Sequence, residues 1–242
     1  MNLYTLFLGI GATFGMWRVS QNNLGNQVIR TAYSALGVLA CALIGSRIGF
    51  FFWQPGYIKV MGWKAIQIWD GGLIWPGAIF GAWVAIGMIA IIRKMDIREL
   101  ADQLSPLLLP IVIMTWLACI STGSGYGVEI SPEFYFPAVV NERGVYASRF
   151  PNQWVAAIVL FLLYLVFDKK IQSKFVGFYS AVTWLVFSIH TLIFSFFRSD
   201  PRPHWLGQPV DIWAAILILV ISIIYFVLVI LLRTTPQKKD IV

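Results

Sequence analysis

The segment Trp69-Asp-Gly-Gly-Leu-Ile-Trp-Pro-Gly-Ala-Ile-Phe-Gly81 opens a long hydrophobic run. Its four glycines and Pro76 make a poor helix start in water. In a membrane, small residues let backbones or a lipid head group approach closely. The segment therefore predicts the start of a membrane helix that is also a site of lipid contact. The glycines are Gly71, Gly72, Gly77 and Gly81.

The composition agrees with a membrane location. Apolar residues make up 59% of the 242 residues and charged residues only 12%, against about 45–50% and about 25% in soluble domains. The chain has room for several spans of about 20 residues and too little polar sequence for a soluble domain beside them. We therefore expect one polytopic membrane domain over residues 1–242.

Seven apolar runs are bounded by charges or turn residues, which predicts an all-α integral membrane protein with seven transmembrane helices. The fourth and fifth runs are short. Either their ends continue through weakly polar residues or the bilayer is locally thin. The runs are Leu3–Val19, Thr31–Trp53, Leu73–Ile92, Leu107–Ile120, Trp154–Phe167, Phe175–Phe196 and Ile212–Leu232.

The cations between the runs predict the orientation. By the positive-inside rule the richer set faces the cytoplasm, which places the N-terminus outside and the C-terminus in the cytoplasm. The net charge of +7 follows from this topology and from contact with anionic lipid, so no nucleic-acid partner is expected. The richer set is Arg18, Arg30, Arg93, Lys94, Arg98, Lys169, Lys170, Lys174, Arg233, Lys238 and Lys239, and the other is Arg47, Lys59, Lys64, Arg143, Arg149, Arg198 and Arg202.

Three arginines of the outer set, Arg47, Arg149 and Arg198, lie at or beside the ends of apolar runs. A guanidinium at head-group depth can bind a phosphate bidentately. The alternative is that each arginine only anchors its helix at the interface. Three of them on one side, beside glycine-rich breaks, favour a site for an anionic phospholipid.

Two other features have simpler interpretations. Cys41 and Cys119 lie in apolar runs without metal-ligand spacing, so we expect no disulfide, no metal site and no cofactor. The polar stretch 121–152 is the longest outer loop. It is either a lid or docking surface for a protein partner, or a solvated loop.

A series of motifs along nearly the whole chain resembles, in order and spacing, the prolipoprotein diacylglyceryl transferase family. The glycine-rich segment 69–81 is one of them. The others are Leu3-Tyr4-Thr5-Leu6, Gly45-Ser-Arg-Ile-Gly-Phe50, Leu100-Ala-Asp102 with Pro106, Cys119-Ile-Ser-Thr-Gly-Ser-Gly-Tyr-Gly127, Arg149-Phe-Pro-Asn-Gln153 and Phe196-Phe-Arg-Ser-Asp200.

The resemblance implies transfer of a diacylglyceryl group from phosphatidylglycerol to the thiol of a lipobox cysteine, at the outer face of the bacterial inner membrane. The partners implied are this phospholipid and a lipoprotein precursor. The chain departs from the family at three reactive positions: Pro76 replaces a histidine, and Trp116 and Thr191 each replace an arginine. Ser195 likewise replaces a glutamate.

Two functions are therefore open. One is a divergent transferase, and the other is a catalytically inactive homologue that binds phospholipid or serves as an accessory subunit of a membrane complex. A site would use Tyr4, Arg47, Arg149 and Arg198 for the lipid phosphate and Gly127 for the signature turn, and Tyr4 is also a candidate catalytic residue. Gly71, Gly72 and Gly77 would admit the lipid. His190 is the candidate imidazole, although a lone membrane histidine often only bonds a neighbouring helix.

Overall fold

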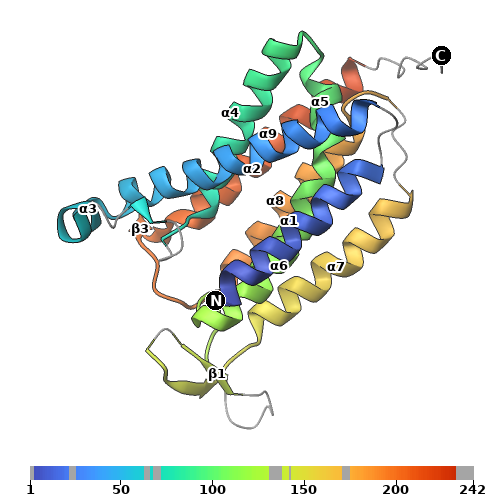
Figure 1. The fold of residues 1–242 in the computed structure, drawn as a ribbon. Helices are drawn as coiled ribbons and strands as arrows, with labels where there is room; N and C mark the ends of the chain where they lie inside the picture. The colour runs from blue at the N-terminus through green and yellow to red at the C-terminus, as the bar shows by residue number, and fades with distance from the viewer. Residues whose placement is uncertain are drawn as a thin grey trace.

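The computed structural model describes residues 3–21, 26–62, 66–67, 72–130, 138–141, 143–170 and 175–232, and it is helical apart from two short strand pairs (Figure 1). The helices are α1 (Leu3–Gln21), α2 (Asn26–Trp53), α3 (Pro55–Met61), α4 (Trp75–Arg93), α5 (Ile97–Leu104), α6 (Leu108–Thr122), α7 (Asn152–Lys170), α8 (Phe178–Phe196) and α9 (Val210–Leu231). Strands β1 (Ala138–Val140) and β2 (Tyr146–Ser148) pair antiparallel, as do β3 (His204–Trp205) and β4 (Gln208–Pro209).

Each of the seven predicted runs coincides with a helix, which confirms the all-α prediction. Five helical stretches of the described chain are long and apolar enough to cross a membrane: Gln27–Trp53, Trp75–Arg93, Ile97–Thr122, Phe178–Phe196 and Val210–Leu231. The short fourth run is extended through α5 and a 3-10 turn, Ser105–Leu107, into one stretch of 26 residues. Seven spans stay a prediction, because α1 and α7 are not among these five. The orientation likewise stays a prediction.

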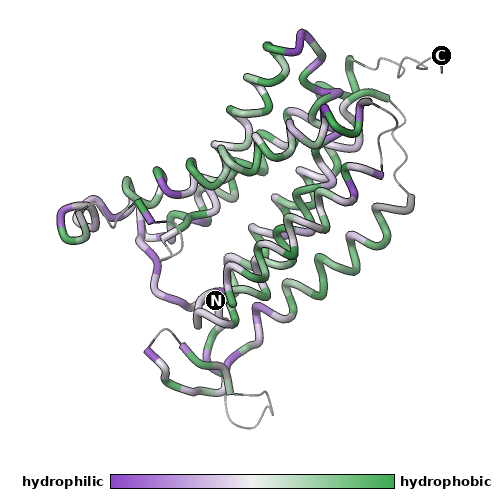
Figure 2. The backbone as a smooth tube through the Cα atoms, viewed as in Figure 1, coloured by the Kyte–Doolittle hydropathy of each residue, from purple (hydrophilic) through white to green (hydrophobic). Residues whose placement is uncertain are grey.

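The long helices pack in pairs. α2 lies along α4, α1 along α6, and α8 along α9, while α7 contacts α6 and α8. Figure 2 shows hydrophobic residues along the middle of the helices and hydrophilic residues gathered toward their ends and in the loops. This distribution is what a bilayer requires of a helical bundle, because polar side chains are costly in its core.

Glycines set the close approach of α2 and α4. A Cβ at Gly45 would lie 2.5 Å from the carbonyl oxygen of Gly77 and 2.9 Å from the Cα of Gly81. Any larger residue at these positions would push the two backbones apart. The glycines of the opening segment thus serve helix packing, at least at Gly77 and Gly81.

Two groups of buried side chains form the core. One lies among α4, α6, α7, α8 and α9 and includes Ile113, Trp116 and Phe187. The other joins α1, α2, α4 and α5 and includes Val19 and Leu100.

Asp102 of α5 caps the N-terminus of α8, although the two helices are far apart in the sequence. Its two carboxylate oxygens accept hydrogen bonds from the backbone N–H groups of Gly177 and Ser180, both at 2.7 Å. These are N–H groups that the first turn of a helix leaves without a partner. The negative charge of the carboxylate also interacts favourably with the positive end of the helix dipole. Asp102 therefore fixes the start of α8 against α5.

Candidate functional site

The segment that follows α6 organises one end of the bundle. Gly123, with φ of 61°, ends α6 in the left-handed conformation, and the chain then forms two isolated β-bridges. Gly127 pairs with Arg198, and Glu129 pairs with Arg149. Two of the three predicted phosphate-binding arginines thus flank one extended segment. We call this end of the molecule the arginine end.

Gly127 is required by this arrangement. A Cβ there would lie 2.6 Å from the carbonyl oxygen of Phe150, and the Gly127 N–H donates to that same oxygen at 3.2 Å. A side chain would therefore separate the segment from the residue that follows Arg149. The predicted signature glycine has a concrete role, which is to hold the two arginine-bearing segments together.

Arg149 is buried although it is charged. Its side chain is 6% exposed, its Nη2 donates to Glu129 Oε1 at 2.7 Å, and its guanidinium lies 4.5 Å from the ring centroid of Tyr126. The Nε and Nη1 atoms are buried without a hydrogen-bond partner among the described residues. Since an unpaired buried charged donor costs more than the about 1–3 kcal/mol of a neutral one, this geometry suits an anionic ligand.

Two residues that follow Arg149 in the sequence also bond to the segment that follows α6. Asn152 and Gln153 open α7 and are almost fully buried. Asn152 Nδ2 donates to the carbonyl oxygen of Gly125 at 3.0 Å, and Gln153 Nε2 donates to that of Ser124 at 2.9 Å. Their amide oxygens are buried with no partner in the part of the chain that the structure describes. The two amide side chains therefore hold the start of α7 against the segment that follows α6.

Arg198 is held in a charge-balanced network. It donates to both oxygens of Asp200, at 2.9 and 2.6 Å, and its Nη1 lies 3.5 Å from Asp211. Arg202 donates to Asp211 at 2.7 Å and to the carbonyl oxygen of Arg198 at 2.8 Å. Two cations thus meet two carboxylates. Arg198 therefore bonds to carboxylates through more of its nitrogens than Arg149, which pairs with Glu129 through Nη2 alone.

The loop carboxylate of Asp200 is kept ionised by these contacts. Burial by itself would raise the pKa of Asp200, but the hydrogen bonds and charge of Arg198 outweigh burial and hold the pKa below its ordinary value. The Asp200 carboxylate therefore orients Arg198. Through Arg202 and Asp211, the same network connects the end of α8 to the start of α9. The network therefore shapes the arginine end.

Arg47 lies in a different cluster. Its Nη1 donates to the carbonyl oxygen of Gly72 at 3.0 Å, and its guanidinium lies 5.4–5.5 Å from the ring centroids of Phe50, Phe51 and Tyr57. A Cβ at Gly72, whose φ is 70°, would lie 2.5 Å from Arg47 Nη1. The described contacts thus join Arg47 to Gly72, and Figure 1 shows this end of α2 well apart from the ends of α6 and α7.

The remaining predicted lipid-contact positions divide between described and undescribed residues. Gly77 packs against the backbone of Gly45, and Gly71 lies outside the described residues. Tyr4 lies in the first turn of α1, which packs along α6. The structure therefore brings Tyr4 toward the arginine end through the packing of α1 on α6.

His190 is buried in the helical core. Its Nε2 lies 2.9 Å from the carbonyl oxygen of Ala156 in α7, and its ring packs on Phe194, with centroids 4.6 Å apart, and on Trp116. Thr191, next to it, is also buried. A ring nitrogen that donates to a helix carbonyl acts as a polar contact between helices, which was the alternative weighed for this residue.

Several residues of this end were not identified from the sequence as site residues. Glu129 and Tyr126 flank Arg149, and Arg202 and Asp211 complete the network of Arg198. The amides Asn152 and Gln153 had a signal, since they stand in the motif that contains Arg149. Within the described ranges, no three of His, Cys, Asp and Glu converge in a way that could hold a metal ion.

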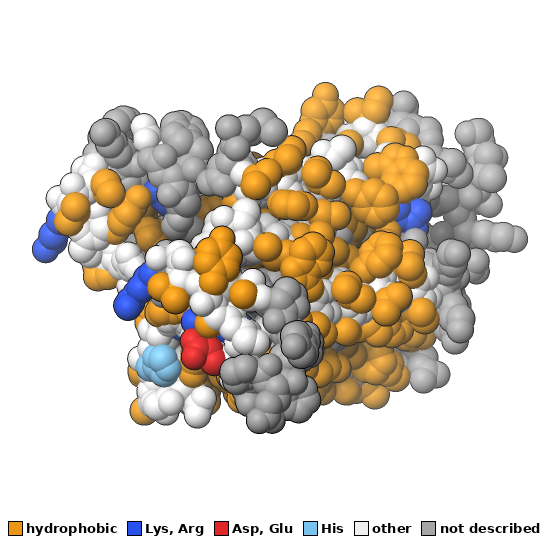
Figure 3. All heavy atoms as spheres, turned by 90° about the horizontal axis from the view of Figure 1, so that it is seen from below, with side chains coloured by type: hydrophobic (Ala, Val, Ile, Leu, Met, Phe, Trp, Pro, Cys, Tyr) orange, Lys and Arg blue, Asp and Glu red, His pale blue; other side chains and the backbone are white. Residues whose placement is uncertain are grey.

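The surface of this end carries both charged and apolar side chains. Figure 3, viewed from below, shows the acidic side chains and most of the basic ones on one part of the face, with apolar side chains covering much of the rest of the described surface. The hairpin of β1 and β2 projects beyond the helices at this end (Figure 1). A charged patch at the edge of an apolar belt suits contact with lipid head groups.

Comparisons with known proteins agree with the resemblance in the motifs. The family model described as prolipoprotein diacylglyceryl transferase matches residues 1–230. The phosphatidylglycerol–prolipoprotein diacylglyceryl transferase of Oleidesulfovibrio alaskensis is 25% identical over 177 residues, 71% of this chain and 62% of that protein. The proteins of the same name from Nitrosomonas europaea and Cupriavidus metallidurans are 31% and 29% identical, over 43% and 31% of this chain and 38% and 27% of their own lengths.

These matched stretches each span less than two thirds of the curated relatives. The family match, by contrast, runs through nearly all of the chain and includes every helix from α1 to α8. The helical fold, the apolar spans and this match lead to one conclusion: the chain is a multi-pass membrane protein that belongs to the prolipoprotein diacylglyceryl transferase family.

Proposed function

We propose that this protein binds the phosphate of a phospholipid at Arg149 and transfers the diacylglyceryl group of phosphatidylglycerol to the cysteine thiol of a lipoprotein precursor. The observation that carries the proposal is the buried guanidinium of Arg149, whose Nε and Nη1 have no hydrogen-bond partner among the described residues. Family membership supports the reaction, and the geometry of Arg149 supports the phosphate contact.

In this reaction the thiolate sulfur forms a bond to the terminal glyceryl carbon of the lipid. The bond between that carbon and the phosphate oxygen breaks, and the electron pair leaves with glycerol phosphate. Negative charge therefore grows on the phosphate oxygen. A fixed guanidinium that is already desolvated stabilises this charge without reorganisation. Arg149 is suited to this role, and Arg198 would orient the neighbouring segment through Gly127.

We further propose that the arginine end faces the outside of the bacterial inner membrane, with the hairpin within residues 121–152 acting as a lid or as the surface that receives the precursor. The charge asymmetry of the loops supports this orientation. Arg47 with Gly72 would form a second lipid-contact position nearer to α2 and α4. Their hydrogen bond and the aromatic rings around Arg47 support an interfacial location.

A second candidate function is phospholipid binding without transfer, as an inactive homologue or an accessory subunit. Two observations favour it. The ring of His190 contacts the Ala156 carbonyl, and Pro76 stands where the family resemblance implies a reactive histidine. A chain without a free imidazole at its site would hold the lipid but give little help in deprotonating the thiol.

Complementation separates the two candidates. The full chain is expressed in cells depleted of their own transferase, and growth and lipidation of a reporter precursor are measured beside Arg149→Gln and the exposed loop control Arg143→Gln. Rescue by the wild type and by Arg143→Gln, but not by Arg149→Gln, supports transfer. Absence of rescue by a well-expressed wild type that still binds phosphatidylglycerol overturns transfer and leaves lipid binding.

A further inference from the structure

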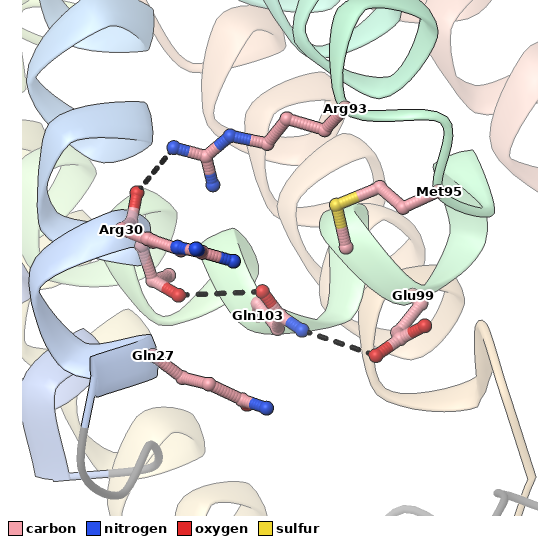
Figure 4. A pocket seen from close by; sticks show the side chains of 7 residues that line it. Gln27, Arg30, Arg93, Met95, Glu99 and Gln103 are labelled. Atoms are coloured by element: carbon pink, nitrogen blue, oxygen red, sulfur yellow. Dashed lines mark hydrogen bonds between the residues drawn. The ribbon is translucent and has the colours of Figure 1, made fainter.

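A pocket lies at the opposite end of the bundle from Arg149 and Arg198. It has a volume of about 400 Å³ and is formed where the start of α2, the end of α4 and α5 meet (Figure 4). Its charged and amide side chains approach the cavity from these three elements. The lining residues are Gln27, Arg30, Thr31, Arg93, Met95, Glu99 and Gln103.

Neither arginine of the pocket has a carboxylate partner among the residues that the structure describes. Arg93 Nη2 donates to the backbone carbonyl oxygen of Arg30 at 2.6 Å, which brings the two cationic side chains to the same part of the cavity (Figure 4). No ion pair between described residues joins either guanidinium to a carboxylate. Like charges held this close favour the binding of an anion.

Two other carboxylates of this region, those of Asp96 and Asp102, bond to other groups. Asp96 binds Arg98 through both oxygens and caps α5, and Asp102 caps α8 through Gly177 and Ser180. Neither is therefore available to neutralise the pocket arginines. Arg30 and Arg93 are exposed, so an anion can reach both guanidinium groups.

The other side of the pocket is acidic. Gln103 connects its two walls, because its Oε1 accepts from Thr31 at 3.4 Å and its Nε2 donates to Glu99 at 3.3 Å. Figure 4 shows Glu99 on the side away from Arg30. The pocket thus presents guanidinium groups at one side and a carboxylate at the other. A ligand that matches both has a phosphate and an ammonium group.

The ammonium should carry N–H groups. A quaternary ammonium has no donor for Glu99 and is usually bound by aromatic rings, whereas none of the described residues that line this pocket is aromatic. A primary ammonium can donate to the Glu99 carboxylate. The pocket therefore fits a phosphoethanolamine group better than a phosphocholine group.

The surroundings favour a lipid over a soluble ligand. Ile29 and Ile92, adjacent in sequence to Arg30 and Arg93, are 59% and 74% exposed, and Ile97 at the start of α5 is 51% exposed. Acyl chains can lie against these side chains while the head group fills the pocket. Burial of apolar surface would then add to the charge-assisted contacts.

We propose that this pocket is a second lipid site, which binds the head group of phosphatidylethanolamine from the leaflet opposite to the arginine end. Its phosphate lies between Arg30 and Arg93, and its ammonium group lies at Glu99. The site does not depend on the proposed transfer reaction, because it shares no residue with the arginine end. It would fix the ends of α2 and α4 against α5.

The test measures lipid binding to the purified full chain in detergent by native mass spectrometry, with phosphatidylethanolamine and phosphatidylglycerol of matched acyl chains as probes. The double variant Arg30→Gln with Arg93→Gln should weaken phosphatidylethanolamine binding by about tenfold, equivalent to about 1.4 kcal/mol. The matched control is Lys94→Gln, which removes an exposed cation beside the pocket. Equal losses in the double variant and the control would overturn the site.

Two further binding measurements test the identity of the ligand. Glu99→Gln should lower the preference for phosphatidylethanolamine over phosphatidylglycerol, and an unchanged preference overturns the ammonium contact. Soluble glycerophosphoethanolamine should bind at least about tenfold more weakly than the lipid, since it lacks acyl chains to bury. Equal binding would overturn the lipid source. Arg149→Gln should leave phosphatidylethanolamine binding intact, which separates this pocket from the arginine end.

Discussion

The carboxylate of Glu129 contacts Arg149 at 2.7 Å, yet the two side chains differ sharply in exposure, at 68% for Glu129 and 6% for Arg149. The guanidinium is fixed by burial and by the ring of Tyr126, whereas the carboxylate can leave for water at little cost. A phosphate can therefore replace Glu129 as the anion that pairs with Arg149. This asymmetry leads to the first two predictions.

Arg149→Gln should lower the affinity for phosphatidylglycerol by about tenfold or more, because charge-assisted hydrogen bonds contribute roughly 1.5–3 kcal/mol each. Arg149→Lys should recover only part of this loss, since an ammonium does not reproduce the fork of a guanidinium. Binding of the lipid by the purified protein is the measurement, with Arg143→Gln as the control. Affinity unchanged in Arg149→Gln would remove Arg149 from the lipid site.

Glu129→Gln should act in the opposite direction. Removal of the competing carboxylate leaves Arg149 without its anion, so phosphatidylglycerol should bind more tightly, by about a few-fold, and thermal stability without lipid should fall. The same binding assay and a melting curve with and without lipid measure both effects. Weaker binding in this variant would show that Glu129 contacts the lipid instead of competing with it.

His190→Gln should keep most of the stability and function of the protein. A glutamine amide can still donate to the Ala156 carbonyl, which the His190 Nε2 approaches at 2.9 Å. His190→Leu should be less stable because it leaves that contact unmade. Melting temperature and complementation are measured together. Loss of complementation in a stable His190→Gln variant would identify the imidazole as a reactive group.

Gly45→Ala should destabilise the bundle by about 1–3 kcal/mol, the usual cost of overpacking. The added methyl group would meet the Gly77 backbone at 2.5 Å, whereas a Cβ at Gly87 of α4 would meet nothing within 4 Å. Gly87→Ala is therefore the matched control and should be neutral or slightly stabilising. Similar melting temperatures for the two variants would contradict the close approach of α2 and α4.

Because of Asp200, we expect the folded protein to lose stability in acid. Its pKa is lower in the folded protein than in the unfolded chain, so as the pH falls below about 4 the unfolded chain takes up the proton first and unfolding becomes more favourable. Asp200→Asn should lower the melting temperature at pH 7 and flatten its decline toward acid. Asp96→Asn, at an exposed ion pair, should change the pH dependence much less.

Particular residues show how far the sequence could predict the site. Arg149 and Gly127 were both expected at a phospholipid site, and the structure brings them to one segment. Gly77 was expected at the lipid and lies instead against Gly45 in helix packing, with any lipid role still untested. Glu129 was not identified as a partner of Arg149, because twenty positions separate them and only the β-bridge makes them neighbours.

The sequence by itself determined the membrane class, the positions of the helices and the family, because hydrophobic runs and motifs are properties of consecutive residues. The tertiary structure decided which charges are compensated. Arg198 is balanced by Asp200 within its network, whereas Arg149 keeps buried nitrogens without described partners and Arg30 has no carboxylate partner in the described chain. Burial and the pairing of charges depend on distances through space, which helix packing sets after the local structure has formed.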